Sequence, residues 1–107
     1  MRRYTTPTLT LVVEGIDITA CDVYVTLRQG KRLLTLTDPE METEVVEQRT
    51  DTKLTVTLTQ EQTALFEAVP VDVQVNYISS DGARDATEVK RVEVWPNLLQ
   101  EVIAYGA

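Results

Sequence analysis

Apolar and polar residues alternate with a period of two in four separate stretches of this chain. KLTVTLT, at 53–59, places its leucines and valine on one side and its threonines on the other. The same alternation recurs at 8–14, 22–28 and 70–77. Successive side chains of a β-strand point to opposite faces, so the pattern predicts strands with one face on a core and one face in water.

Turn signals separate these stretches from further strands. The residues at 29–31, Gln-Gly-Lys, end one strand and predict a short hairpin to RLLTLTD at 32–38. Asp-Gly within 79–82 predicts another tight turn before TEVKRVEV at 87–94. METEVVEQR, at 41–49, is predicted to be an edge strand, because its glutamates discourage another chain from pairing there. The sequence therefore predicts an all-β fold, an antiparallel β-sandwich of about seven strands.

One interruption breaks the alternation between the strands predicted at 53–59 and 70–77. Thr59 and Gln62 have the spacing of a capping box, in which each side chain satisfies a backbone N–H of the other. Leu65 and Phe66 follow as an apolar face. We expect one short helix over about 60–67, serving as a crossover between the two sheets and closing the end of the sandwich.

The length of 107 residues is typical of one domain, so we expect a single domain spanning 1–107. Residues 1–6 are expected to fray, because chain ends usually lack partners. The segment 96–107 begins with a proline, and the apolar run 98–103 follows it. It is either a last strand or an arm that docks on a neighbour, and the sequence leaves both alternatives open.

The charge balance bears on the class of partner. The net charge is -7, from 17 acidic and 10 basic residues, and the basic residues are dispersed. Nucleic acid and anionic lipid both require a concentrated positive surface, so neither is an expected partner. The first residues lack the apolar core of a signal peptide, and no run is long enough to span a bilayer.

Few residues offer catalytic or metal-binding chemistry. The chain has no histidine, the commonest general base and metal ligand. Its single cysteine, Cys21, is expected to be a small, partly buried side chain at a strand entry. The acidic run at 38–51 contains no glycine, which favours a solvated edge over a calcium loop. We therefore expect no catalytic residue, no metal and no cofactor, and a protein that is not an enzyme.

The chain's one tryptophan, Trp95, precedes the C-terminal segment. Tryptophan is enriched in interfaces and stacks on sugar rings, but it also covers the ends of cores, and these alternatives stay open. The predicted interaction surface combines it with the apolar residues that follow, and homo-oligomerisation through this surface is one expectation. Its members are Trp95, Leu98, Leu99, Val102 and Ile103.

Four segments carry a family resemblance when they are taken in order. They are TPTLTL (6–11), DVYVTLRQG (22–30), LTQEQTALF (58–66) and VDVQVNYISSDGARDATEVKRVEV (71–94). Together they resemble small proteins encoded among the tail genes of phages and prophages of Gram-positive bacteria. More distantly, they resemble the N-terminal domain of phage upper baseplate proteins. The resemblance implies an immunoglobulin-like sandwich with no catalytic residues to transfer.

The resemblance also implies a function and a location. We expect a non-enzymatic structural or interaction module whose partners are other phage tail or baseplate proteins. It would be located in the virion, or in the host bacterial cytoplasm during assembly. The alternative is a small carbohydrate- or surface-binding module, with Trp95 or Tyr77 as its stacking platform.

Overall fold

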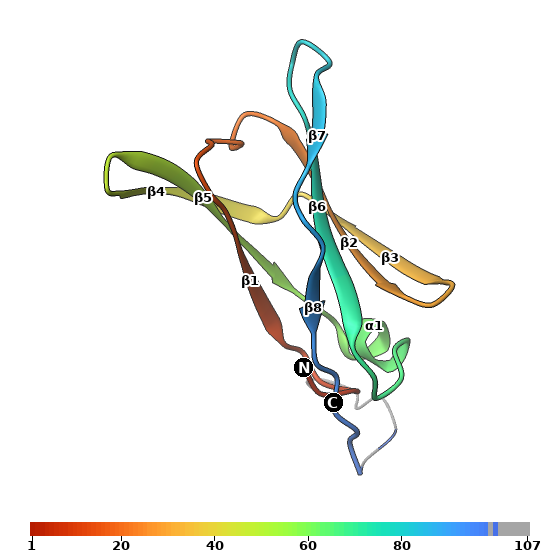
Figure 1. Cartoon of the computed structure of the whole chain (residues 1–107). Helices are drawn as coiled ribbons and strands as arrows, with labels where there is room; N and C mark the ends of the chain where they lie inside the picture. The colour runs from red at the N-terminus through yellow and green to blue at the C-terminus, as the bar shows by residue number, and fades with distance from the viewer. Residues whose placement is uncertain (99, 101–107) are drawn as a thin grey trace, which may run out of the picture.

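The structure is a computed structural model and describes residues 1–98 and residue 100. In this part of the chain two antiparallel sheets contain eight strands, and one short helix connects them (Figure 1). The predicted all-β sandwich is therefore confirmed. The number of strands exceeds the predicted seven because an additional short strand, Arg84–Ala86, precedes the last predicted one.

The smaller sheet has three strands in the order β1-β5-β4. Its members are β1 (Thr8–Val13), β5 (Arg49–Thr57) and β4 (Glu40–Val46). As predicted from its glutamates, β4 lies at an edge. The central strand β5 begins at Arg49, earlier than the alternation at 53–59 suggests, and it forms a long hairpin with β4.

The larger sheet has the order β3-β2-β6-β7, and β8 also pairs with β6. Its strands are β2 (Asp22–Gln29), β3 (Arg32–Thr37), β6 (Val71–Ile78), β7 (Arg84–Ala86) and β8 (Lys90–Val92). The predicted short hairpin joins β2 to β3. In Figure 1 this hairpin and the β4–β5 hairpin extend in opposite directions from the centre of the molecule.

The strand order is that of an immunoglobulin-like sandwich. In that fold strands B, E and D share one sheet, and C′, C, F and G form the other in variable-type domains. Here β1, β5 and β4 take the first set of places, and β3, β2, β6 and β7–β8 take the second. An isolated parallel bridge between Arg2 and Trp95 adds the N-terminal segment to the edge beside β8.

A β-bulge separates β7 from β8. Three steps along β6, from Val73 to Asn76, face four steps along the opposite chain, from Ala86 to Lys90. The extra residue shifts the pairing by one position, which bends and twists the strand locally. The strand predicted over 87–94 is therefore wrong in its bounds, because a bulge occupies its beginning.

Thr87 holds the bulge in place through its backbone and its side chain. Its N–H donates to the Val75 carbonyl at 2.9 Å, and its Oγ1 accepts from the Val75 N–H at 3.1 Å. The hydroxyl thus replaces a backbone acceptor that the shifted register removes. The N–H and the carbonyl of Val75 therefore both have hydrogen-bond partners, as buried backbone groups require.

The core lies between the two sheets and follows the predicted alternation. The inward side chains of β2 and β6 pack against those of β1 and β5, and the residue that closes the end of the core, after the helix, is Phe66. Thirteen apolar residues are buried among those described: Val13, Ile18, Val23, Val25, Leu27, Leu54, Val56, Leu58, Phe66, Val71, Val73, Val75 and Val94.

The N-terminal segment, which was expected to fray, forms hydrogen bonds with residues near Trp95. The Arg3 N–H donates to the Trp95 carbonyl at 3.0 Å, and the Trp95 N–H donates to the Met1 carbonyl at 2.8 Å. The Asn97 side-chain amide also donates to the Arg3 carbonyl at 3.1 Å. These partners lie more than ninety positions apart in the chain, so the local sequence pattern does not predict the contacts.

The two hairpins use different tight turns. Gly30 has φ 60° and is followed by Lys31, which is not in the left-handed region, as in a type II′ turn. In the β4–β5 hairpin both Glu47 (φ 49°) and Gln48 (φ 65°) have positive φ, as in a type I′ turn. Side chains with a Cβ rarely adopt this conformation, so the second turn carries a backbone cost.

Replacing Gln48 with Gly is expected to raise the free energy of unfolding by about 1 kcal/mol, because glycine adopts positive φ without a steric penalty. Lys31→Gly is the matched control, at the same position of the turn in which φ is not positive. There glycine only adds freedom to the unfolded chain and should lower stability by roughly 0.5–1 kcal/mol. Urea denaturation of both variants measures the change in the free energy of unfolding. A change in the same direction for the two substitutions would contradict the turn assignment.

Candidate functional site

The structure describes two of the five residues of the predicted interaction surface. Trp95 is 51% exposed and Leu98 is fully exposed, while Leu99, Val102 and Ile103 lie outside the described residues. The backbone of Trp95 is engaged with the N-terminal segment, so about half of its side chain remains accessible. The second predicted stacking platform, Tyr77, is partly buried on the inner face of β6 and packs against the core.

Sheet edges offer a different candidate, because an edge strand presents unpaired backbone groups that another chain can bind. The β4 edge carries repeated negative charge, because glutamates occupy alternate positions along it, at Glu40, Glu42 and Glu44. The predicted edge position of this segment is confirmed, because β4 is the end strand of its sheet.

The β7–β8 edge carries other safeguards. The bulge interrupts the β7–β8 edge, and Arg84, Lys90 and Arg91 place positive charge along it. Lys90 also lines, with β1 residues, a small cavity of about 20 Å³ between β1 and the larger sheet. Bulges and lysines are common means by which proteins prevent edge pairing.

The β3 edge lacks such safeguards. The β1 edge, TLTLVV, is also uncharged, but the cavity lined by its residues measures only about 20 Å³. Its sequence RLLTLT carries no charge after Arg32, and the side chain of Leu33 is 66% exposed. A long, apolar edge without charge is the kind that accepts another strand. The sequence already contains this difference between the two edges. RLLTLT has no acidic residue, whereas the nearby β4 segment has three glutamates.

The hairpin register determines which backbone groups of β3 are free. A two-residue turn is closed by the hydrogen-bonded pair Gln29–Arg32, and hydrogen-bonded pairs alternate along an antiparallel ladder. The backbone groups of Leu33, Thr35 and Thr37 therefore point away from β2, toward the edge. No hydrogen bond from another part of the described chain reaches them.

Two hollows lie beside this edge, on the open side of the sandwich. One, of about 430 Å³, lies between β3 and the helix and is lined by Arg32, Leu33, Leu34, Ala64, Leu65 and Phe66. The other, of about 250 Å³, lies between the segment 36–40 and the last residues of β5. The larger hollow is mostly apolar and the smaller one is mostly polar, and both lie next to free backbone donors and acceptors.

The helix α1 (Gln60–Ala64) forms one wall of the larger hollow and is shorter than the predicted 60–67. Its predicted capping box is present, with Thr59 Oγ1 accepting from the Gln62 N–H and Gln62 Oε1 accepting from the Thr59 N–H. At its other end, Arg3 donates to the Ala64 carbonyl at 3.0 Å. Arg32 donates to the Leu65 carbonyl. Cations at a helix C-terminus satisfy otherwise unpaired carbonyls.

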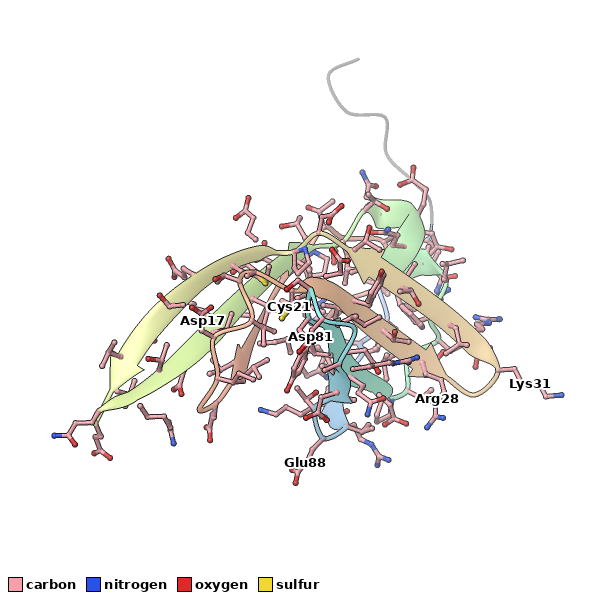
Figure 2. All side chains as sticks on the ribbon, turned by 90° about the horizontal axis from the view of Figure 1, so that it is seen from above. Asp17, Cys21, Arg28, Lys31, Asp81 and Glu88 are labelled. Atoms are coloured by element: carbon pink, nitrogen blue, oxygen red, sulfur yellow. The ribbon has the colours of Figure 1, made fainter. Side chains whose placement is uncertain are left out.

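Gln29 fixes the segment that follows the helix. Its side-chain amide donates to the carbonyls of Glu67 (3.0 Å) and Val69 (2.9 Å), and its Oε1 accepts from the Glu67 N–H at 2.7 Å. The crossover is thus held by the β2–β3 hairpin. Figure 2 shows the tip of this hairpin, with Lys31, projecting from the body of the molecule.

The outer face of the larger sheet carries a third hollow, of about 310 Å³. Tyr24 contributes an aromatic ring to it, and Arg84 donates to the Asn76 side-chain oxygen at 3.3 Å. Nearby, Asp72 forms ion pairs with Arg28 at 3.2 Å and with Arg91 at 3.6 Å. The residues that line the hollow are Tyr24, Thr26, Thr35, Asn76, Ile78 and Arg84.

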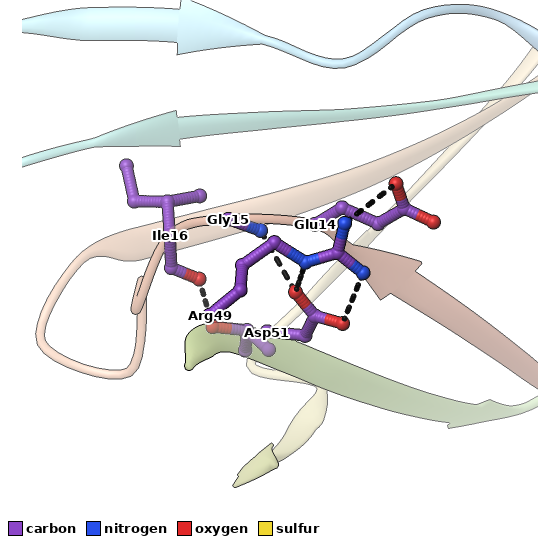
Figure 3. A network of polar contacts seen from close by, with 6 residues as sticks. Glu14, Gly15, Ile16, Arg49 and Asp51 are labelled. Carbon is purple, nitrogen blue, oxygen red and sulfur yellow. Dashed lines mark hydrogen bonds and ion pairs between the residues drawn. The ribbon is translucent and has the colours of Figure 1, made fainter. Parts of the chain in front are cut away.

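Asp51 departs from the prediction that the acidic run at 38–51 is a solvated edge, because it is only 5% exposed. Its carboxylate accepts from the Gly15 N–H at 2.8 Å and from Arg49 at 2.9 and 3.2 Å (Figure 3). Arg49 also lies 3.8 Å from Glu14. The network joins the β1–β2 loop to the β4–β5 hairpin, which identifies it as a structural contact.

The Gly15 hydrogen bond, followed by that of Arg49, holds the pKa of Asp51 below its ordinary value of 3.8. A carboxyl whose pKa is lowered by folding stabilises the fold above its unfolded pKa, and that contribution disappears as the pH falls through the lowered value. Compared with Asp51→Asn, the native chain should therefore lose its stability advantage below about pH 4. Urea denaturation across the acid range measures this, and a difference independent of pH would contradict it.

Cys21 lies just before β2 and is partly buried against the core, as predicted. Within residues 1–98 and residue 100, no group of three or more His, Cys, Asp or Glu side chains is placed to hold a metal ion. The same part of the chain contains no helix with the length and apolar character needed to cross a membrane.

Comparison with known proteins does not assign the chain to a family. No family model matches it, and no curated protein is significantly similar to it.

Proposed function

We propose that this protein is a non-enzymatic interaction module of a phage or prophage tail or baseplate, and that it binds its partners by adding a strand to β3. The binding mode is inferred from one observation. The β3 edge has no charged residue after Arg32 and lies beside an apolar hollow. The tail context is supported by the resemblance of the segments 6–11, 22–30, 58–66 and 71–94 to phage tail-region proteins.

Strand addition uses two kinds of recognition that this edge supplies. The backbone groups of Leu33, Thr35 and Thr37 provide hydrogen bonds to an extended segment, which give affinity. Alternate side chains of the added strand then enter neighbouring pockets, which give specificity. The hollow between β3 and α1 is positioned to receive such side chains.

Thr35→Pro is expected to abolish binding while the domain stays folded. Proline removes the outward N–H at the middle of the edge, and it is tolerated on an edge strand where that N–H makes no ladder bond. Thr43→Pro is the matched control, since Thr43 has the same outward position at the middle of the β4 edge. Mass spectrometry of particles purified from the phage or prophage that carries the gene should detect the native chain and Thr43→Pro, but not Thr35→Pro.

Two results of this experiment would contradict the proposal. Absence of the native chain both from particles and from assembly intermediates would contradict the proposed location in a tail or baseplate. Equal incorporation of both proline variants would contradict the proposal that β3 is the binding edge.

A second candidate function is favoured by the hollow on the outer sheet face. Tyr24 offers a ring for stacking, and Asn76 and Arg84 offer hydrogen-bond groups for sugar hydroxyls. Because Tyr77 is turned toward the core, Tyr24 replaces it as the platform of a carbohydrate-binding module. A glycan array compares the native chain with Tyr24→Ala, and binding that the substitution leaves unchanged would contradict this site.

A further inference from the structure

We propose that the strand added to β3 is β3 of a second copy of the chain, paired antiparallel about a two-fold axis at Thr35. The inference rests on the proposed use of β3 as the binding edge, and it names the partner. Two-fold dimers are the commonest protein assemblies, and they require a surface complementary to itself. The β3 edge meets this requirement in its hydrogen bonds, its charges and its leucines.

The hydrogen bonds match because of the position of the axis. With Thr35 opposite Thr35 of the second copy, Leu33 stands opposite Thr37 of that copy, and Thr37 opposite its Leu33. These three residues are the ones whose backbone groups point outward. Each pair exchanges two hydrogen bonds in an antiparallel ladder, so every outward donor and acceptor between Leu33 and Thr37 is used. Moving the axis by one residue along β3 would leave some of these groups unpaired.

The charges match in the same register. Arg32 begins β3 and Asp38 directly follows its last residue, so antiparallel pairing brings Arg32 of each copy near Asp38 of the other. More broadly, β3 has Lys31 and Arg32 at one end, and Asp38 and Glu40 follow its other end. Antiparallel pairing therefore places the positive end of each strand beside the negative end of the other. Cross-strand pairs of opposite charge stabilise a sheet, whereas like charges destabilise it.

The β4 edge provides the contrast within the same molecule. Its outward residues are Met41, Thr43 and Val45, so the equivalent dimer would have its axis at Thr43. That register places Glu42 opposite Glu44 of the second copy, and Glu44 opposite its Glu42. Two like-charged pairs disfavour this assembly. Self-pairing is thus favoured by the charge pattern at β3 and opposed by it at β4.

The inner face of β3 gives the dimer an apolar contact. Leu34 and Leu36 are only partly buried, because β4 diverges from β3 on the open side of the sandwich. In the dimer Leu34 lies opposite Leu36 of the second copy on this inner face. The leucines of each copy would then extend the core of the other, beside the half-exposed Leu65.

Disulfide trapping tests both the dimer and its register. In a Cys21→Ala background, Thr35→Cys should form a covalent dimer under mild oxidation, since residues in a hydrogen-bonded pair have Cα atoms about 5.5 Å apart, within disulfide range. Leu33→Cys should not link to itself, because the two copies of residue 33 would lie roughly 13 Å apart along the strands. An equimolar mixture of Leu33→Cys and Thr37→Cys should form the mixed dimer.

Non-reducing electrophoresis gives the yield of each species, and light scattering gives the mass of the native chain. We expect the mass of two chains, reduced to one by Thr35→Pro and unchanged by Thr43→Pro. Equal trapping of Leu33→Cys and Thr35→Cys would overturn the register, and a native monomer that Thr35→Cys does not trap would overturn the dimer. A monomeric chain that is still incorporated into particles through β3 would leave the proposed function intact and refute only this inference.

Discussion

Phe66→Ala is expected to lower the free energy of unfolding by about 3–5 kcal/mol, the largest effect of any single substitution considered. Phe66 is 0% exposed and is the largest fully buried side chain among the described residues. It follows α1 and fills the space between the two sheets at one end of the core. Domains of this size are stable by only about 5–15 kcal/mol, so the variant should be close to unfolding, as urea denaturation would show.

Leu65→Ala is the matched control, one position away in the same connector. Leu65 is 49% exposed and lies at the wall of the hollow beside β3, so its truncation should cost less than about 1 kcal/mol. The sequence predicted that both residues would close the end of the sandwich, and only Phe66 does so. Equal losses from the two variants would mean that the helix packs differently from the structure described.

The alternation of apolar residues was sufficient to predict the sheets. Each apolar residue of 54–58 and 71–75 that was placed on the core face is buried, because alternation in a strand depends only on local backbone geometry. The capping box at Thr59 and Gln62 was predictable for the same reason, since its two members lie three residues apart.

Features that depend on distant partners were not predictable. TEVKRVEV has the composition of one strand, and its bulge is defined only by the register against β6. The N-terminal segment has no local signal for its pairing with residues near Trp95. Asp51 belongs to an acidic run, and its burial follows from Gly15, which lies 36 positions earlier.

The candidate site falls between these cases. The run RLLTLT, which is uncharged after Arg32, and the glutamate-rich run EMETEVV are both visible in the sequence. Their meaning depends on knowing that both strands are edges and which backbone groups face outward, and that information comes from the topology and the hairpin register. Pattern alone predicted strands there, whereas the fold shows that one of them has outward backbone groups beside an apolar hollow.

Thr52→Val is expected to lower the free energy of unfolding by about 1–3 kcal/mol, although valine has nearly the same shape. The hydroxyl of Thr52 donates to the Ile16 carbonyl at 2.8 Å and accepts from the Ile18 N–H at 3.0 Å. Thr52 and Ile18 are fully buried, so valine would leave the Ile18 N–H without a partner and without water. Such unpaired buried groups carry the full cost of their desolvation.

Thr57→Val, on the exposed face of β5, should change stability by no more than about 0.5 kcal/mol. Its hydroxyl contacts only that of Thr8, at 3.1 Å, and water can replace this contact. Urea denaturation of both variants therefore separates two functions of threonine in one strand. Threonines on the outer face fit a pleated surface, whereas Thr52 holds the β1–β2 loop against the core. If the two substitutions had the same effect, the loop would not depend on this hydroxyl for its position.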